Sequence, residues 1–288
     1  MIKPFFFFVL LTSNSFADSA KFAVTLARDA YLKPEAFVKK YEALAQHVHS
    51  YKTQHLNFYT LINKENVLFV VFEGSRDIYS WERNLDIGEV GFVHDSERKV
   101  HRGFYQEAIL ARNTLLNKMA FTQKVVVSGH SLGGAVALLF AALLEHDGYD
   151  VSLFTFGSPP VGNQAFVSSI EELSHIRYQH FLDIVPQMKK VYIDKLKSLL
   201  SELNSHIENT QTLKNILSSI SGFSYNYIHH GQQKILHNIQ SLKDEDNNTN
   251  FAKKVLSQTL MYHSAQTYYK GVYKKEKILF KLIEHFIF

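Results

Sequence analysis

The chain has 288 residues, 46% of them hydrophobic, and a formal net charge of +4 at pH 7. This length suits a single enzyme domain with a sizeable core, and so mild a charge gives no argument for nucleic-acid binding. Because the chain has no cysteine, a disulfide scaffold, a thiol nucleophile and thiolate metal sites are excluded. Its 15 histidines show no H-E-x-x-H or other metal-ligand spacing, so we expect no metal site.

The first residues have the features of a secretory signal peptide. Lys3 supplies a positive end, an unbroken apolar run covers Phe5–Leu11, and small residues at Ser15 and Ala17 fit a signal-peptidase site. The run is far shorter than the ~20 apolar residues that a membrane span needs. We therefore expect residues 1–17 to be a signal peptide, cleaved after Ala17, and the mature protein to be secreted or periplasmic. A buried N-terminal strand or a short anchor is the alternative.

We expect the remaining residues, 18–288, to form one domain, in which strand and helix patterns alternate. The predicted elements are helices over 20–31 and 36–45, strands over 57–62 and 67–72, a helix over 103–119, a strand from Val125, a helix to His146, a strand over 151–156, a helix over 161–173 and a strand over 176–182. This alternation is typical of an α/β fold with a mainly parallel central sheet and helices on both faces.

The regular alternation ends at Pro186. Apolar residues then repeat three and four positions apart over 192–220, which predicts a helical insertion at about 190–222. An amphipathic stripe of this kind usually packs on the core. The alternative is a substitute lid or a flap that contacts a lipid surface. A polar loop over 244–250 and a mostly helical, aromatic-rich stretch over 251–288 follow.

The most informative stretch is an apolar run over 125–127 that leads into Gly129-His-Ser-Leu-Gly133 and an Ala- and Leu-rich helical pattern. A strand, a G-x-S-x-G turn and a helix together are typical of a nucleophile elbow. The sharp turn forces Ser131 into strained backbone geometry and lifts its hydroxyl above the sheet, and a Cβ on either flanking glycine would collide with the neighbouring strand or helix. The N–H of Leu132, at the helix N-terminus, can face a developing oxyanion.

Five motifs in order along the chain resemble the class 3 lipase family, the α/β-hydrolase group that includes fungal triacylglycerol lipases. They are Phe72-Glu-Gly-Ser75 with Trp81 and Asn84-Leu85 after it, Val100-His-Arg-Gly-Phe104, Gly129 to Ala135, Thr155 to Asn163, and Asp183-Ile-Val-Pro186. Five ordered matches are far more specific than the elbow alone. The resemblance covers roughly residues 57–186 and implies an α/β-hydrolase fold.

The resemblance also implies a catalytic triad in the order Ser131, Asp183, His263. Asp183 follows a predicted strand, at the carboxyl edge of the sheet, where open α/β sheets bind their ligands. His263 matches the family's histidine, which lies near the C-terminus just before an aromatic-rich helix. His229 and His230 stay as alternatives, because triad partners are identified by geometry and not by sequence position.

For the oxyanion, the resemblance implies a second donor beside Leu132, the backbone N–H of Ser75, and the glycine before it lets the loop approach the substrate closely. Three departures accompany this motif. Glu73 stands where the family usually has Arg, and Ser80 replaces the usual Asp. The region 86–98, where fungal members carry a lid helix, is short and mostly polar, so the sequence does not indicate a lid there.

These residues predict a serine ester hydrolase of lipase type that acts on acyl esters of lipids through an acyl-enzyme on Ser131, without metal or cofactor. Phospholipase A1, another carboxylesterase or an acyltransferase would use the same triad, because acyl-chain and headgroup preference depends on loop shape. A non-catalytic lipid-binding protein that retains the fold is the alternative from another class. We expect a lipid or ester substrate and peripheral contact with a lipid surface, and we expect neither nucleic acid nor a stable protein partner.

Overall fold

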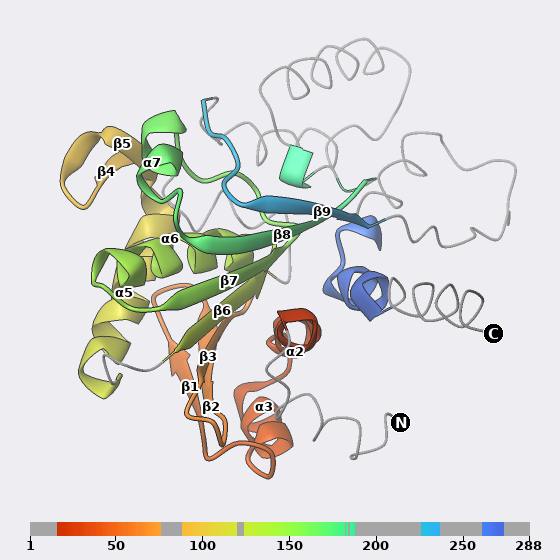
Figure 1. Ribbon diagram of the computed structural model, residues 1–288. Helices are drawn as coiled ribbons and strands as arrows, with labels where there is room; N and C mark the ends of the chain where they lie inside the picture. The colour runs from red at the N-terminus through yellow and green to blue at the C-terminus, as the bar shows by residue number, and fades with distance from the viewer. Residues whose placement is uncertain are drawn as a thin grey trace, which may run out of the picture.

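The computed structural model describes residues 16–75, 88–119, 124–181, 183, 185–187, 226–236 and 261–273. Its centre is a seven-stranded sheet in the order β1-β2-β3-β6-β7-β8-β9 (Figure 1). The strands are β1 (His47–Lys52), β2 (Asn57–Ile62), β3 (Leu68–Phe72), β6 (Val125–His130), β7 (Val151–Phe156), β8 (Ser174–His180) and β9 (Gln232–Leu236). β1, β2 and β3 pair antiparallel, whereas β3 and the four strands after it pair parallel. The predicted α/β fold with a mainly parallel sheet is confirmed.

Helices cover both faces of this sheet. α5 (Arg102–Leu115) and α6 (Leu132–His146) lie on one face, and α2 (Phe16–Asp29), α3 (Pro34–Tyr41) and a helix over 265–273 lie on the other (Figure 1). Each face has its own hydrophobic cluster, one around Phe72 and Phe140 and the other around Phe22 and Phe154. α6 is buried from Leu132 to Leu144, because it lies between the sheet and α5 and so needs no polar face.

The sheet register brings the ends of four strands to one edge. Phe72, the last residue of β3, pairs with Gly129 of β6, and Thr155 of β7 pairs with the same glycine. Since these strands run parallel, the segments that follow them emerge together at the carboxyl edge, where α/β folds bind their ligands. This edge therefore carries Ser75, Ser131 and Asp183, the residues that follow β3, β6 and β8.

The structure contains strands that the sequence patterns did not predict. β1 and β9 are the two edge strands, and most of their side chains are exposed or half-buried. Edge strands need no continuous apolar run, so their polar sequences gave no strand pattern. β4 (Glu89–Phe92) and β5 (Asp95–His101) form a separate antiparallel hairpin that overlaps the short, mostly polar region 86–98.

Other predicted bounds shift by a few residues. α7 (Gln164–Ser169) is shorter than the helix expected over 161–173, because Asn163 caps its start by accepting from the Phe166 N–H at 3.0 Å. β8 begins two residues before the expected strand over 176–182. Short single turns of 3-10 helix, η2 (Leu116–Lys118) and η3 (Val185–Gln187), complete the described elements.

The N-terminal helices are joined by a buried carboxylate. Asp29, at the end of α2, accepts hydrogen bonds from Arg28 Nε at 2.8 Å, Lys40 Nζ at 2.5 Å and Tyr41 Oη at 2.6 Å. Burial opposes the charge of Asp29, but these donors outweigh it and lower the pKa of the carboxyl. The ion-pair network therefore anchors α3 to the end of α2.

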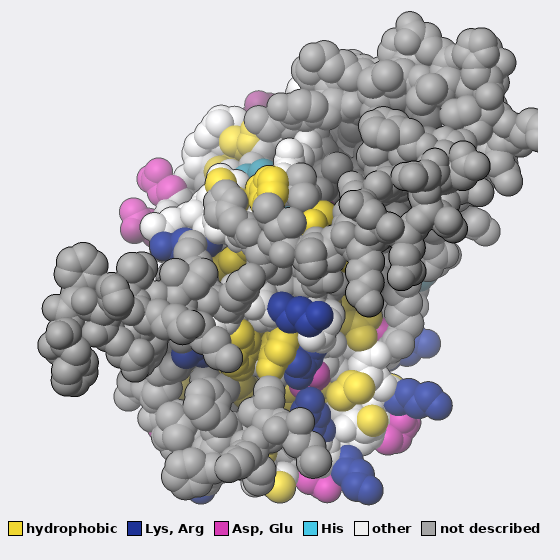
Figure 2. Space-filling model, turned by 90° about the vertical axis from the view of Figure 1, so that its right-hand side faces the viewer, with side chains coloured by type: hydrophobic (Ala, Val, Ile, Leu, Met, Phe, Trp, Pro, Cys, Tyr) yellow, Lys and Arg dark blue, Asp and Glu magenta, His cyan; other side chains and the backbone are white. Residues whose placement is uncertain are grey.

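Several sequence predictions concern residues outside the described ranges. The helical insertion at about 190–222, the polar loop over 244–250 and most of the stretch 251–288 belong to them. α2 begins at Phe16, so the predicted cleavage point after Ala17 lies in its first turn. In the described ranges, no helix combines the length and the apolar character that crossing a bilayer would require. In the described part of the face seen in Figure 2, Lys and Arg side chains are interspersed with acidic and hydrophobic ones.

Candidate active site

Ser131 lies in the turn between β6 and α6, with φ 58° and ψ −127°. A positive φ is unusual for any residue with a Cβ and marks a strained backbone. The surrounding structure holds this conformation, because the Ser131 N–H donates to Phe156 O at 2.9 Å and its carbonyl accepts from Gly134 and Ala135 in the first turn of α6. The strand–turn–helix geometry expected for a nucleophile elbow is therefore present.

The glycines around Ser131 are required by close backbone approaches. A Cβ on Gly129 would collide with the carbonyl group of Gly133, and a Cβ on Gly133 would lie 2.8 Å from Glu73 O and would collide with Phe72 O. Contacts below 3.0 Å are essentially never made by real Cβ atoms. The absence of side chains at these positions lets α6 start directly against the ends of β3 and β6.

The structure brings Ser131, His263 and Asp183 into one hydrogen-bonded row. His263 Nε2 lies 2.7 Å from Ser131 Oγ, and His263 Nδ1 lies 2.8 Å from Asp183 Oδ2. The three side chains are separated by 132 and 80 positions in the sequence. All three residues are buried, with Ser131 at 2%, His263 at 7% and Asp183 at 0% exposure. This is the arrangement in which a histidine can take a proton from a serine hydroxyl while a carboxylate orients the ring.

Asp183 is held by more than His263. Its Oδ1 accepts from the Val185 N–H at 2.9 Å, and its Oδ2 also accepts from the Tyr268 hydroxyl at 2.6 Å. Tyr268 comes from the helix over 265–273 and is fully buried; burial, the nearby Asp183 charge and this hydrogen bond together raise its pKa well above the ordinary value, so it stays a hydroxyl donor. Three donors, from His263, Val185 and Tyr268, thus hold the carboxylate without leaving it exposed to water.

The candidate oxyanion donors lie at the same edge of the sheet. Leu132 is the first residue of α6, where backbone N–H groups point out of the helix end. Ser75 follows Gly74, and a Cβ on Gly74 would lie 2.6 Å from the carbonyl oxygen of His130. The loop that carries Ser75 therefore passes directly beside the end of β6. Glu73, which replaces the family's usual Arg, is buried and accepts from Asn57 Nδ2 at 2.6 Å.

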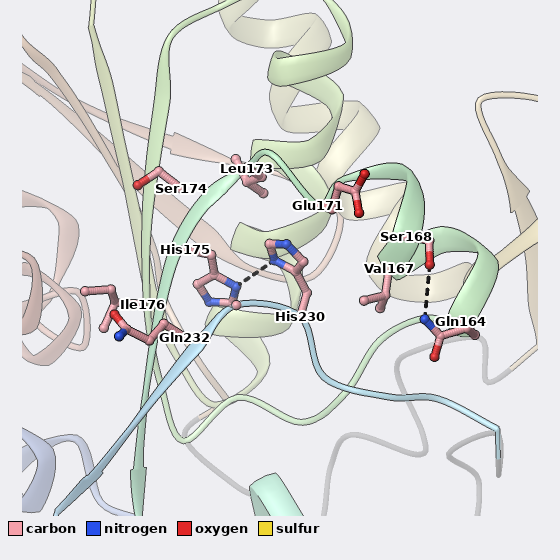
Figure 3. Close-up of a pocket in the computed structure, with 11 residues that line it drawn as sticks. Gln164, Val167, Ser168, Glu171, Leu173, Ser174, His175, Ile176, His230 and Gln232 are labelled. Carbon is pink, nitrogen blue, oxygen red and sulfur yellow. Dashed lines mark hydrogen bonds between the residues drawn. The ribbon is translucent and has the colours of Figure 1, made fainter.

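The alternative histidines occupy other positions. His230 faces His175 in a cavity of about 590 Å³ at the amino ends of β8 and β9, with the two Nδ1 atoms 3.2 Å apart (Figure 3). His229 donates from Nε2 to the carbonyl oxygen of Pro186 at 2.6 Å. Of the three candidates, His263 is the histidine hydrogen bonded to Ser131.

Two tyrosines near the site had no role in the sequence predictions. Tyr268 contacts Asp183, and Tyr31, which follows α2, contacts the elbow through His130. The only sequence signal for Tyr268 is its place in the aromatic-rich stretch behind His263. Tyr31 lies 99 positions from His130, so no local pattern could have found this contact.

Comparisons with known proteins match part of this chain to one family. A model of the family described as "Lipase (class 3)" matches residues 69–193. A secreted mono- and diacylglycerol lipase 1 from Fusarium solani is 34% identical over 137 residues, which are 45% of this chain and 41% of that protein. A lipase from Rhizomucor miehei is 34% identical over 139 residues, which are 44% of this chain and 38% of that protein. The chain thus spans about two fifths of the length of these relatives.

Solved structures extend the likeness to the fold. A structure of Rhizomucor miehei triacylglyceride lipase aligns with a TM-score of 0.51 and 25% identity, and covers 63% of this chain and 77% of that one. A mono- and diacylglycerol lipase from Aspergillus oryzae aligns with a TM-score of 0.52 and 22% identity over 62% of this chain and 76% of that one. Residues 69–193 of this chain thus match the class 3 lipase family model, and the α/β fold around them is similar to that of fungal lipases.

Proposed function

We propose that this protein is a serine ester hydrolase of lipase type, which cleaves acyl esters of lipids through an acyl-enzyme on Ser131. The observation that carries the proposal is the row in which His263 lies 2.7 Å from Ser131 Oγ and 2.8 Å from Asp183 Oδ2. Lipid binding alone would not require a buried serine, histidine and aspartate in hydrogen-bonded order. The same observation therefore disfavours a non-catalytic lipid-binding protein.

In the first half of the proposed reaction, Ser131 Oγ attacks the ester carbonyl while its proton passes to His263 Nε2. Asp183 stabilises the imidazolium that forms, and the backbone N–H groups of Ser75 and Leu132 hold the oxyanion. His263 then gives the proton to the departing alcohol, which leaves an acyl group on Ser131.

In the second half, water replaces the alcohol. His263 takes a proton from the water as it attacks the acyl-enzyme, and returns that proton to Ser131 Oγ when the fatty acid leaves. Each proton taken is given back, so the reaction consumes only ester and water. The residues described here can therefore carry every step of the chemistry without a metal or cofactor.

The proposed substrates are triacylglycerols or related acyl lipids, and the protein would contact a lipid surface to reach them. Relatives with 34% identity are named a mono- and diacylglycerol lipase and a lipase. Phospholipase A1, other carboxylesterase or acyltransferase activity would use the same row of residues, since the acyl acceptor and headgroup are chosen by loops. We also propose export through residues 1–17, in keeping with the relatives named as secreted lipases.

Labelling with a fluorophosphonate, read by mass spectrometry, tests the proposal directly. Wild type should react at Ser131, and Ser131→Ala and His263→Ala should each abolish labelling. The matched control is the double variant His229→Ala/His230→Ala, which should still label. Folded wild-type protein that does not label would contradict the proposed function. A panel of p-nitrophenyl esters, triglyceride and phospholipid then distinguishes the substrate classes.

A further inference from the structure

A second series of hydrogen bonds ends at the backbone of His263, whereas Ser131 and Asp183 contact its side chain. The Tyr31 hydroxyl lies 2.8 Å from His130 Nδ1, and His130 Nε2 lies 2.5 Å from the backbone carbonyl oxygen of His263. The rings also pack on one another, with centroids 5.9 Å apart for Tyr31 and His130 and 4.9 Å apart for His130 and His263. The triad itself requires none of these contacts.

The direction of this series follows from the chemistry of its members. A carbonyl oxygen can only accept, so His130 Nε2 must carry the hydrogen that it donates to His263. Burial, together with the nearby His263, keeps the pKa of His130 well below its ordinary value, so the ring is neutral and its Nδ1 has a lone pair. The Tyr31 hydroxyl is therefore the donor to Nδ1, and it selects the tautomer of His130 that can hold His263.

The same hydroxyl lies against the segment that carries Ser75. A Cβ on Gly74 would collide with Tyr31 Oη, so the backbone of Gly74 packs directly on this oxygen. Tyr31 thus touches the segment after β3 as well as the end of β6. A shift of the Tyr31 hydroxyl would therefore displace both Gly74 and His130.

We propose that Tyr31 and His130 are positioning residues that hold the backbone of His263, and so keep its imidazole in line between Ser131 and Asp183. The inference rests on the proposed function, because it assigns two further residues to that site. Asp183 fixes one end of the His263 ring, and His130 fixes the main chain from which the ring extends. A displacement of about 1 Å in a reacting group can cost ~100-fold in rate, so a second anchor on His263 has a catalytic effect.

Steady-state kinetics on p-nitrophenyl butyrate separate positioning from binding. We expect Tyr31→Phe to lower kcat roughly tenfold and to leave KM within about twofold, because the hydroxyl acts through His130 on the backbone of His263. His130→Leu removes the donor to His263 and should lower kcat further, by about 10- to 100-fold. His130→Gln keeps an amide N–H that can reach the His263 carbonyl, and should restore most of the kcat that the leucine variant loses.

The matched control is Tyr59→Phe. Tyr59 is buried, and its hydroxyl lies 3.4 Å from the carbonyl oxygen of Leu32, the residue after Tyr31. We expect this variant to keep the kcat of wild type. Equal losses of kcat in Tyr31→Phe and Tyr59→Phe, with equal losses of Tm, would show a general loosening of the turn and would overturn the proposal. So would a folded His130→Leu with unchanged kcat.

A readout independent of activity separates this proposal from the proposed function. In protein labelled with 15N-histidine, the nitrogen shifts of His130 should show the Nε2–H tautomer in wild type and a mixture in Tyr31→Phe. An Nδ1–H tautomer in wild type would overturn the positioning proposal even if the enzyme is active. The expected tautomer in a protein that fluorophosphonates do not label would instead contradict only the proposed function.

Discussion

The hydroxyl of Tyr268 lies 2.6 Å from Asp183 Oδ2, the same oxygen that lies 2.8 Å from His263 Nδ1. Tyr268 also accepts from the His180 N–H at 3.0 Å. One buried hydroxyl thus ties the carboxylate to the end of β8. Because Asp183 is completely buried, its charge depends on such donors.

We expect Tyr268→Phe to lower turnover roughly tenfold, which corresponds to about 1.4 kcal/mol. The change removes one donor from a buried carboxylate, and a hydrogen bond to a charged group contributes about 1.5–3 kcal/mol to stability. Esterase kinetics and urea unfolding would measure both effects. Tyr178→Phe is the control, since the rings of Tyr178 and Tyr268 both pack on Phe156, with centroids 5.2 Å and 6.4 Å from it. If both variants behave like wild type, the Tyr268 hydroxyl has no role in holding Asp183.

Alanine at Gly133 should destabilise the protein more than alanine at Gly134. A Cβ on Gly133 would collide with the carbonyl oxygens of Phe72 and Glu73, whereas a Cβ on Gly134 would lie 2.9 Å from the Ser158 Cβ and 3.0 Å from the carbonyl oxygen of Gly129. The overlap is therefore deeper at Gly133, and overpacking costs about 1–3 kcal/mol. We expect Gly133→Ala to approach or exceed the upper end of that range and Gly134→Ala to lie near the lower end, as measured by urea unfolding. The reverse order would contradict the close approach of α6 to β3.

The His175 and His230 pair predicts that stability falls in mild acid. Burial, with smaller effects of His230 and Arg177, holds the pKa of His175 well below its ordinary value, and burial lowers that of His230. Below pH about 6.5 the unfolded chain therefore binds more protons than the folded one. The free energy of unfolding should have its full value above pH about 6.5. It should decrease as the pH falls, by up to about 2 kcal/mol per histidine at pH about 5.

Urea unfolding at several pH values would measure this slope. The double variant His175→Gln/His230→Gln should reduce the slope, because both of these buried rings are gone, while the buried His130 still contributes to it. The control is His47→Gln/His49→Gln, which changes two histidines that are exposed on β1 and leaves the buried pair in place. A wild-type stability that stays constant from pH about 7 to about 5 would contradict the prediction.

Export can be tested at the N-terminus of the chain. We expect the full-length protein, expressed in a secreting host, to be recovered outside the cytoplasm with Asp18 as its first residue. Phe7→Arg interrupts the apolar run and should keep the protein inside the cell with its N-terminus unprocessed. N-terminal sequencing gives the result. An exported protein that retains residues 1–17 would favour the short anchor instead.

The position of the elbow could be predicted from the sequence because all of its requirements are local. A β-branched strand, two glycines and a helix that is apolar all round are contiguous in 125–146, and the collisions at Gly129 and Gly133 arise within this unit and the strand beside it. The place of Asp183 was also predictable, since a residue after a parallel strand must lie at the carboxyl edge. The edge strands β1 and β9 were not, because backbone pairing alone holds them and their side chains follow no apolar pattern.

By itself, then, the sequence determined the fold class, the strained serine and the edge of the sheet at which the site lies. Only the tertiary structure showed that His263, and not His229 or His230, is hydrogen bonded to Ser131, because the partner of each histidine depends on what lies opposite it after folding. The contacts of Tyr31 and Tyr268 were likewise decided by packing, since α2 and the helix over 265–273 meet the sheet from distant parts of the chain. Hydrogen bonds between such segments depend on the topology of the sheet. A local pattern of residues does not predict which distant segments that topology brings together.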